Sequence, residues 1–125
     1  MAYGRECLTM KPGTSSPDAR QSFPRRGEIY WVALDPTVGR EIRTTRPALV
    51  VSPDEMNQAL GTVILAPITS IVREFPTRYT IRLQRKTASV ALDQIRTVSV
   101  ERLLKKITTV DPRPALAILQ EIFAD

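Results

Sequence analysis

An almost unbroken apolar and aromatic run, residues 28–34, constrains the fold of this chain more than any other passage. Side chains alternate between the two faces of a strand, so Tyr30 and Trp31 would lie on opposite faces. A strand with bulky apolar groups on both faces is buried on both sides or wrapped into a small barrel. Asp35-Pro36 ends the run. The passage therefore predicts a small curled sheet built around this strand.

Five more short runs are predicted as strands, because each is apolar or alternating and is bounded by turn residues. They cover residues 48–51, 62–66, 79–83, 89–95 and 106–110. Pro47 opens the first of them, where a strand tolerates proline. Residues 67–70 are predicted as a turn, residues 73–78 as a polar loop and residues 100–103 as one helical turn. Short strands in this number predict a compact, mostly antiparallel barrel.

Two helices complete the predicted fold. The first carries a capping-box start signal, with Ser52 as the N-cap, Pro53 at the first helical position and Glu55 closing the box. Gly61 ends it. A final helix is expected after Asp111-Pro112, and its apolar stripe should pack against the barrel. The stripe consists of Leu116, Leu119, Ile122 and Phe123.

The length and charge of the chain indicate one globular domain with a modest preference for anionic partners. A chain of 125 residues, 42% apolar and 25% charged, can bury one core. The net charge is +5, but residues 1–26 carry five basic and two acidic side chains, a net +3, which leaves +2 for the rest. An anion site must therefore come from local clustering of cations.

The N-terminal segment differs from the rest in composition. Residues 1–24 include Lys-Pro-Gly-Thr-Ser-Ser-Pro and have no usable hydrophobic period. Such a segment cannot bury enough apolar surface to order itself, so it is predicted as a flexible tail. Phe23 is expected to fasten the end of that tail to a folded domain over residues 25–125.

Several residue types are rare or absent, which excludes whole classes of site. Cys7 is the only cysteine, so no disulfide within the chain and no cysteine-rich metal site can form. Histidine, the commonest general base and metal ligand, does not occur. No apolar run approaches the ~20 residues of a membrane helix, and the N-terminus lacks the apolar stretch of a secretory signal. The chain is predicted to be cytoplasmic, with no metal and no cofactor.

A loop dense in guanidinium and hydroxyl groups separates the first two predicted strands. It spans residues 39–47 and reads Gly-Arg-Glu-Ile-Arg-Thr-Thr-Arg-Pro. Loops that a rigid scaffold holds at both ends commonly carry function. Guanidinium groups fixed in this way are typical of phosphate binding. The loop is therefore the first candidate functional element.

Six motifs follow one another along residues 25–125. They are Arg26-Gly27-Glu28-Ile29-Tyr30-Trp31, Leu34-Asp35-Pro36, Gly39-x-Glu41, Arg46-Pro47-Ala48-Leu49-Val50-Val51, Ala66-Pro67-Ile68-Thr69-Ser70 and Leu92-Asp93-Gln94-Ile95-Arg96-Thr97. In this order and spacing the chain resembles the MazF/PemK family of toxin endoribonucleases. Three features depart from the family pattern. Residues 1–24 have no counterpart, Thr45 stands where some members place histidine, and Ala91 stands where some carry a basic side chain.

The resemblance implies a mostly β (α+β) fold, an SH3-like small antiparallel barrel with short helices and a C-terminal helix, working as a homodimer. It implies metal-independent, sequence-specific cleavage of single-stranded RNA, mainly messenger RNA. It also implies a MazE-like antitoxin partner whose disordered acidic tail occupies the RNA site. In the family the catalytic pair is the arginine before the proline and the threonine of the Thr-Ser turn, which fall on Arg46 and Thr69.

The chemistry of RNA cleavage assigns roles to these residues. Attack by the 2′-hydroxyl requires removal of its proton, stabilisation of the pentacoordinate phosphorus and departure of the 5′-oxygen. Arg46 can hold two phosphoryl oxygens, and Thr69 can donate a hydroxyl hydrogen bond to them. Without histidine, the base is predicted to be a carboxylate or a water held by one, with Glu41 and Asp93 as candidates. Further RNA contacts are expected from Arg40, Arg43, Thr45, Ser70, Arg78 and Gln94.

Each of these residues has a structural alternative. Arg46 could be a solvated or salt-bridged side chain, Thr69 could cap a turn, and Glu41 could pair with a loop arginine. Asp93 and Gln94 could form a buried hydrogen-bonding pair. Trp31 is predicted to pack in the core or a dimer interface rather than to stack on a base. A cationic cluster is interpreted as a solvated strand edge, with a phosphate-binding rim as the alternative; it consists of Arg82, Arg85 and Lys86.

Two other functions remain open at this point. A non-enzymatic toxin of the CcdB type, which binds DNA gyrase, has a similar barrel. Those toxins use a tryptophan close to the C-terminus, whereas this chain ends Ile122-Phe123-Ala124-Asp125. An inactive RNA-binding SH3-like module is the third alternative.

Overall fold

The structure, a computed structural model, describes residues 23–34 and 44–124. Its strands are β1 (Glu28–Leu34), β2 (Thr44–Val50), β3 (Thr62–Thr69), β4 (Arg78–Leu83), β5 (Lys86–Ala91), β6 (Arg96–Ser99) and β7 (Leu103–Thr109). Its helices are α3 (Asp54–Leu60) and α4 (Arg113–Phe123), with single 3-10 turns η2 (Leu92–Gln94) and η3 (Val100–Arg102). No helix in this part of the chain is long and apolar enough to cross a membrane.

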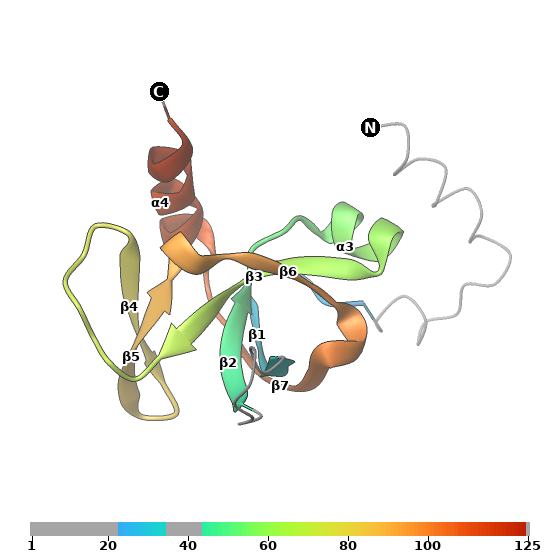
Figure 1. Cartoon of the computed structure of the whole chain (residues 1–125), viewed down its shortest axis with the longest axis horizontal. Coiled ribbons are helices and arrows are strands. Elements are labelled where there is room, and N and C mark those ends of the chain that lie inside the picture. Colours follow the sequence, from blue (N-terminus) through green and yellow to red (C-terminus); the bar gives the residue numbers. More distant parts are fainter. Residues whose placement is uncertain (1–22, 35–43, 125) are drawn as a thin grey trace, which may run out of the picture.

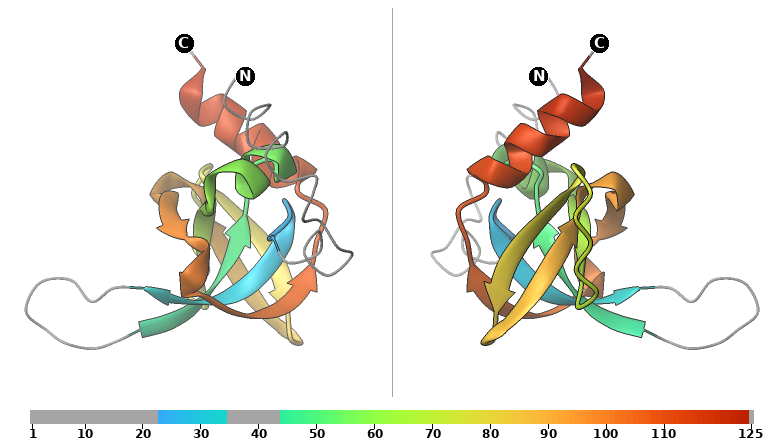
Figure 2. Two further views of the ribbon diagram at one scale, coloured as in Figure 1. Left: turned by 90° about the vertical axis from the view of Figure 1, so that its right-hand side faces the viewer. Right: turned by 90° about the vertical axis from the view of Figure 1, so that its left-hand side faces the viewer.

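The strands form one curled antiparallel sheet in the order β4-β5-β3-β2-β1-β7, and β6 pairs with β3 beside this path. Figure 1 shows the β4–β5 hairpin standing to one side of β3. Figure 2 shows both helices over the same end of the curled sheet. The predicted class, a small and mostly β antiparallel barrel with short helices, is confirmed.

The core consists of two clusters that lie on opposite faces of β1. Ile29 belongs to one cluster and Val32 to the other, and neither side chain is exposed. The prediction that this strand is buried on both faces is therefore confirmed. Burying one such side chain stabilises the fold by roughly 1.5–3 kcal/mol. The first cluster also packs against α4 through Ala115, Leu116, Leu119 and Ile122.

The predicted stripe of α4 is wrong at its last residue. Phe123 is 71% exposed, whereas Leu116, Leu119 and Ile122 pack on the core. The helix ends at Phe123, so its last turn extends beyond the sheet that the stripe covers (Figure 1).

Strand boundaries differ from the sequence prediction wherever a partner strand extends the ladder. β2 begins at Thr44 because its pairing with β1 continues as far as Leu34. β3 continues to Thr69 because β5 pairs with it there, so residues 67–69 are strand and not a turn. The predicted strand over residues 89–95 is β5 followed by η2. β6 was not predicted, and β7 begins at Leu103 rather than at residue 106.

The predicted capping box is also wrong. The helix N-cap is Pro53, and it makes no side-chain capping hydrogen bond. Ser52 is buried instead, where its hydroxyl donates to Asn57 Oδ1 and accepts the Ile64 N–H at 3.0 Å. Asn57 Nδ2 in turn donates to the Pro24 carbonyl at 3.0 Å. Ser52 is therefore used to join the start of the domain, α3 and β3.

The start of the folded domain is held by both polar and aromatic contacts. Arg26 N–H donates to Asp54 Oδ1 at 2.7 Å, and Arg26 Nε donates to the Val51 carbonyl at 2.8 Å. Phe23 is half-buried, with the Arg25 guanidinium 4.7 Å from its ring centre. The predicted flexible tail lies outside the described residues, apart from Phe23 and Pro24.

Gly27→Ala is expected to destabilise the protein by about 1–3 kcal/mol. Gly27 has a φ of +95°, and an added Cβ would lie 2.7 Å from the Val110 carbonyl oxygen. That oxygen cannot move freely, because Gly27 hydrogen-bonds Val50 and Val110 through its own backbone. Urea unfolding of the purified variant measures the loss.

Gly61→Ala is the matched control. Gly61 also has a positive φ, +70°, but an added Cβ would meet nothing within 4 Å. The free energy of unfolding of Gly61→Ala should fall only by the cost of a left-handed backbone at alanine, about 1–2 kcal/mol. Equal losses in the two variants would show that the contact with Val110 is unimportant.

Candidate active site

The pairing of β2 with β3 brings Arg46 and Thr69 to one end of one face of the sheet. Ala48 pairs with Pro67 in antiparallel register. Arg46 and Thr69 each lie two residues beyond this pair, in opposite chain directions, so both side chains share its face. The sheet register therefore places the two predicted catalytic residues at the same end of the same surface.

The neighbouring strands add further residues to this face. Thr69 pairs with Ser89 of β5, so Ala91, two residues on, lies on the same face. Ala91 pairs with Arg78 of β4, which brings the Arg78 side chain to this surface. β6 carries Arg96 to it through its pairing with β3.

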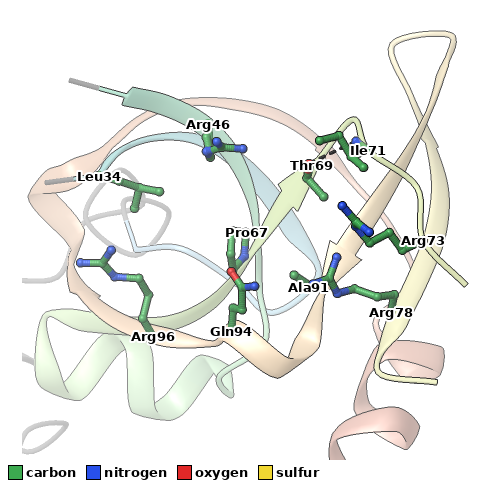
Figure 3. A pocket seen from close by; sticks show the side chains of 10 residues that line it. All are labelled: Leu34, Arg46, Pro67, Thr69, Ile71, Arg73, Arg78, Ala91, Gln94 and Arg96. Atoms are coloured by element: carbon green, nitrogen blue, oxygen red, sulfur yellow. Dashed lines mark hydrogen bonds between the residues drawn. The ribbon is translucent and has the colours of Figure 1, made fainter. Parts of the chain in front are cut away.

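These residues line a groove of about 380 Å³. Its polar groups are four guanidiniums, one hydroxyl and one amide, and no lining residue is a carboxylate. The lining consists of Leu34, Arg46, Pro67, Thr69, Ile71, Arg73, Arg78, Ala91, Gln94 and Arg96. Figure 3 shows Arg46 and Thr69 on one side of the opening and Gln94 and Arg96 on the other. Cations gathered in a concave surface attract and hold anionic ligands.

Arg46 and Thr69 both keep groups that a ligand could use. Arg46 is exposed, and it forms no salt bridge with any residue that the structure describes. Thr69 Oγ1 accepts the Ile71 N–H at 3.1 Å. Thr69 thus caps a turn, as its structural alternative predicted, and also lines the groove. Since the hydroxyl oxygen is the acceptor, its hydrogen remains available for a second hydrogen bond.

Arg78 and Asp93 form an ion pair at the edge of the groove. Arg78 Nε lies 2.9 Å from Asp93 Oδ1, and the two side chains are 11% and 36% exposed. The hydrogen bond from Arg78 lowers the pKa of the Asp93 carboxyl, so this carboxylate is charged at neutral pH. The alternative of a buried Asp93–Gln94 pair is wrong, because both residues are exposed on η2.

Comparison with known protein families identifies the family of this chain. The profile of the family described as the PemK-like, MazF-like toxin of type II toxin-antitoxin system matches residues 25–123. The chain belongs to this family.

Curated relatives and solved structures of MazF/PemK toxins agree with this assignment. The chain is 37% identical to endoribonuclease EndoA of Bacillus subtilis over 70% of this chain and 80% of EndoA. It is 38% identical to endoribonuclease MazF9 of Mycobacterium tuberculosis over 66% of this chain and 79% of MazF9.

Two solved structures share the fold. Toxin MazF-mt6 of Mycobacterium tuberculosis has a TM-score of 0.65 at 25% identity, over 77% of this chain and 95% of that one. A MazE-MazF structure from Deinococcus radiodurans has a TM-score of 0.66 at 24% identity, over 79% of this chain and 94% of that one. The predicted MazF/PemK family and fold are both confirmed.

The groove of this MazF/PemK family member contains only some of the predicted site residues. Four of them line it, namely Arg46, Thr69, Arg78 and Gln94. Thr45 is exposed on β2 but alternates away from Arg46, and Ser70 is exposed beyond the end of β3. Neither lines the groove. Arg40, Glu41 and Arg43 lie outside the described residues.

Two arginines of the groove were missed. Arg96 was missed because β6 was not predicted, and without that strand the residue has no defined face. Arg73 belongs to the loop before β4, and it was not among the predicted site residues although that loop was predicted to be polar. The cluster of Arg82, Arg85 and Lys86 is exposed at the β4–β5 turn and does not line the groove, in agreement with a solvated strand edge. Trp31 is half-buried and does not line it either.

The described part of the chain contains no group of three or more His, Cys, Asp or Glu residues that could hold a metal ion. The polar groups that line the groove are guanidinium, hydroxyl and amide. The arrangement is therefore suited to binding phosphates and the polar edges of bases.

Proposed function

We propose that this chain is the toxin of a type II toxin–antitoxin system and a metal-independent, sequence-specific endoribonuclease of single-stranded messenger RNA. Family membership and the names of the curated relatives confirm the enzyme class predicted from the sequence. The observation that carries the finer proposal is the groove, in which four arginines and Thr69 meet without a carboxylate in the lining. Such a surface fits a flexible, unpaired polyanion.

The proposed reaction is an internal transesterification. The 2′-oxygen loses its proton and attacks the adjacent phosphorus, while the bond to the 5′-oxygen breaks and that oxygen takes up a proton. Arg46 holds the two non-bridging oxygens as negative charge grows on them, and Thr69 donates its hydroxyl hydrogen to one of them. Glu41 and Asp93 remain the candidates for the base. Asp93 is ionised, as a base must be, but its bond to Arg78 reduces its basicity.

Incubating the purified protein with a long natural transcript in the presence of EDTA tests the function. We expect cleavage at a small set of sequences, yielding fragments whose 5′ ends carry hydroxyl groups. Mapping those ends would reveal the recognised sequence. Cleavage that requires added magnesium would contradict metal independence. Salt-sensitive binding without any product would favour the inactive RNA-binding module, and poisoning of gyrase without RNA cleavage would favour the CcdB-type toxin.

Thr69→Val is expected to lower the cleavage rate about 10²-fold, the lower end of the effect of removing one oxyanion donor. Valine has a similar shape but no hydroxyl, so the loss reports the hydrogen bond. Single-turnover cleavage of a short oligonucleotide measures it. Thr69→Ser keeps the hydroxyl and is the control. An equal loss in both variants would assign the effect to the turn that Thr69 caps rather than to the reaction.

The proposed partners follow from the same assignment. The toxin would act in the cytoplasm as a homodimer and would be inhibited by a MazE-like antitoxin. The shared fold of the MazE-MazF structure from Deinococcus radiodurans supports an antitoxin of that type. The acidic tail expected in such an antitoxin is complementary to the cationic groove.

A further inference from the structure

The segment between β3 and β4 exposes three large apolar side chains beside the cationic groove. Ile71, Val72 and Phe75 are 58%, 42% and 49% exposed. Ile71 lines the groove, as does Arg73 from the same segment. Single exposed apolar residues are ordinary, but several in one segment beside a binding surface indicate a contact surface.

Phe75 is fixed next to a groove arginine by two contacts. Arg78 N–H donates to the Phe75 carbonyl at 3.0 Å, which closes the turn that begins β4. The Arg78 guanidinium lies 5.6 Å from the centre of the Phe75 ring, within the range of a cation–π contact. The ring is therefore held at the groove edge while half of its surface stays exposed.

Asp93 also holds this guanidinium. Arg78 Nε is bonded to Asp93 at 2.9 Å, and the Arg78 side chain is only 11% exposed. The guanidinium is thus held by contacts with both a carboxylate and an aromatic ring. Fixed planar groups lose little conformational entropy when a second planar group stacks on them.

We propose that the exposed Phe75 ring, held in place by Arg78, forms a shelf on which one unpaired base of the RNA stacks, with the adjoining phosphates beside Arg73. This inference rests on the proposed ribonuclease function and adds a subsite to it. Bases of single strands stack on aromatic rings and on arginine planes. The surrounding charge favours a nucleic acid as the occupant, because the ring contacts Arg78, one of the four arginines that line the groove.

The test measures binding of a short single strand that carries a 2′-deoxy residue at the cut position. Phe75→Ala should weaken binding about 5- to 150-fold, the range expected for loss of one base–aromatic stack. Phe75→Trp should keep the affinity. The matched control is Phe123→Ala, which removes an even more exposed phenylalanine (71%) at the C-terminal end of α4. It should bind as the unchanged protein does.

Strands with one base removed at each position in turn locate the shelf. For the unchanged protein, one abasic position should weaken binding by the same factor as Phe75→Ala. In Phe75→Ala that position should cost nothing more, since the stack is already lost. Abasic costs that are equal in both proteins at every position would overturn the proposal.

Two further measurements on the same variants test whether the Phe75 ring contacts something other than RNA. Light scattering reports the oligomeric state, and a binding assay reports the affinity for the antitoxin. If Phe75→Ala alters only the oligomeric state, the ring packs on a second copy, and the shelf is overturned. If it weakens only antitoxin binding, the ring contacts a protein partner, and the shelf is again overturned. Because the strand is not cut, the binding result stands apart from the cleavage assay. Absence of cleavage by the unchanged protein contradicts the proposed function alone.

Discussion

Arg46→Ala is expected to lower the rate of RNA cleavage by ~10²–10³ while the fold stays intact. The charge that develops on the phosphoryl oxygens would lose its bidentate donor. The fold should tolerate the change, because the Arg46 side chain is exposed and its residue pairs with Val32 of β1 through the backbone. Single-turnover cleavage gives the rate, and thermal unfolding verifies the fold.

Two further variants separate charge from geometry. Arg46→Lys keeps the positive charge but loses the planar guanidinium with its two parallel donors. Its cleavage rate should therefore fall between the rates of the unchanged protein and of Arg46→Ala. Arg82→Ala removes an exposed arginine of β4 that does not line the groove, and it should cleave at the normal rate. Full activity in Arg46→Ala would remove this residue from the mechanism. An equal loss in Arg82→Ala would assign the effect to general electrostatic attraction.

Replacing the 2′-hydroxyl at the cut position with hydrogen should abolish cleavage. In the proposed reaction the 2′-oxygen is the attacking atom, so its removal leaves no nucleophile and no route to a cyclic phosphate. Binding should change little, since guanidinium contacts to phosphates supply most of the affinity. The products of an otherwise identical RNA, separated by mass, should end in a 2′,3′-cyclic phosphate and a 5′-hydroxyl.

The same substitution at every other position provides the control. Deoxy residues away from the cut should leave cleavage measurable, with modest losses where a 2′-hydroxyl is recognised. A strand that is still cut at its deoxy position would require water as the nucleophile. In that case the roles given to Arg46 and Thr69 would need another reaction.

The parts of the fold that depend on local pattern could be predicted from the sequence. The run over residues 28–34 carries apolar side chains on both faces, and it is the doubly buried strand β1. The stripe of Leu116, Leu119 and Ile122 has helical spacing, and it packs on the core. In both cases the apolar side chains whose burial stabilises the element form a pattern within the element's own sequence.

Other parts depend on a distant partner and could not be predicted in this way. Ser52 has every local mark of an N-cap, yet its hydroxyl bonds Asn57 and the Ile64 N–H. Residues 96–99 form a strand because β3 offers them a free edge. A short stretch of sequence does not show which distant segment will pair with it. Tertiary contacts therefore determined both the role of Ser52 and the strand over residues 96–99.

The candidate site shows the same division. Arg46 and Thr69 were predicted from the order of the sequence motifs, and the sheet register brings both residues to one groove. Arg96 depends on β6, and the bond between Arg78 and Asp93 joins positions fifteen residues apart. Such contacts follow from strand geometry, which only the folded chain supplies.

The groove draws its lining from β1 through β6, from the segment between β3 and β4, and from η2. A polyanion lying in it would touch many strands at once and would bind the native state alone. Such a ligand should raise the melting temperature even when it cannot be cut, by mass action on the folded population. Loss of any one of those strands would dismantle the groove, so catalysis and the cooperative unfolding transition should vanish together.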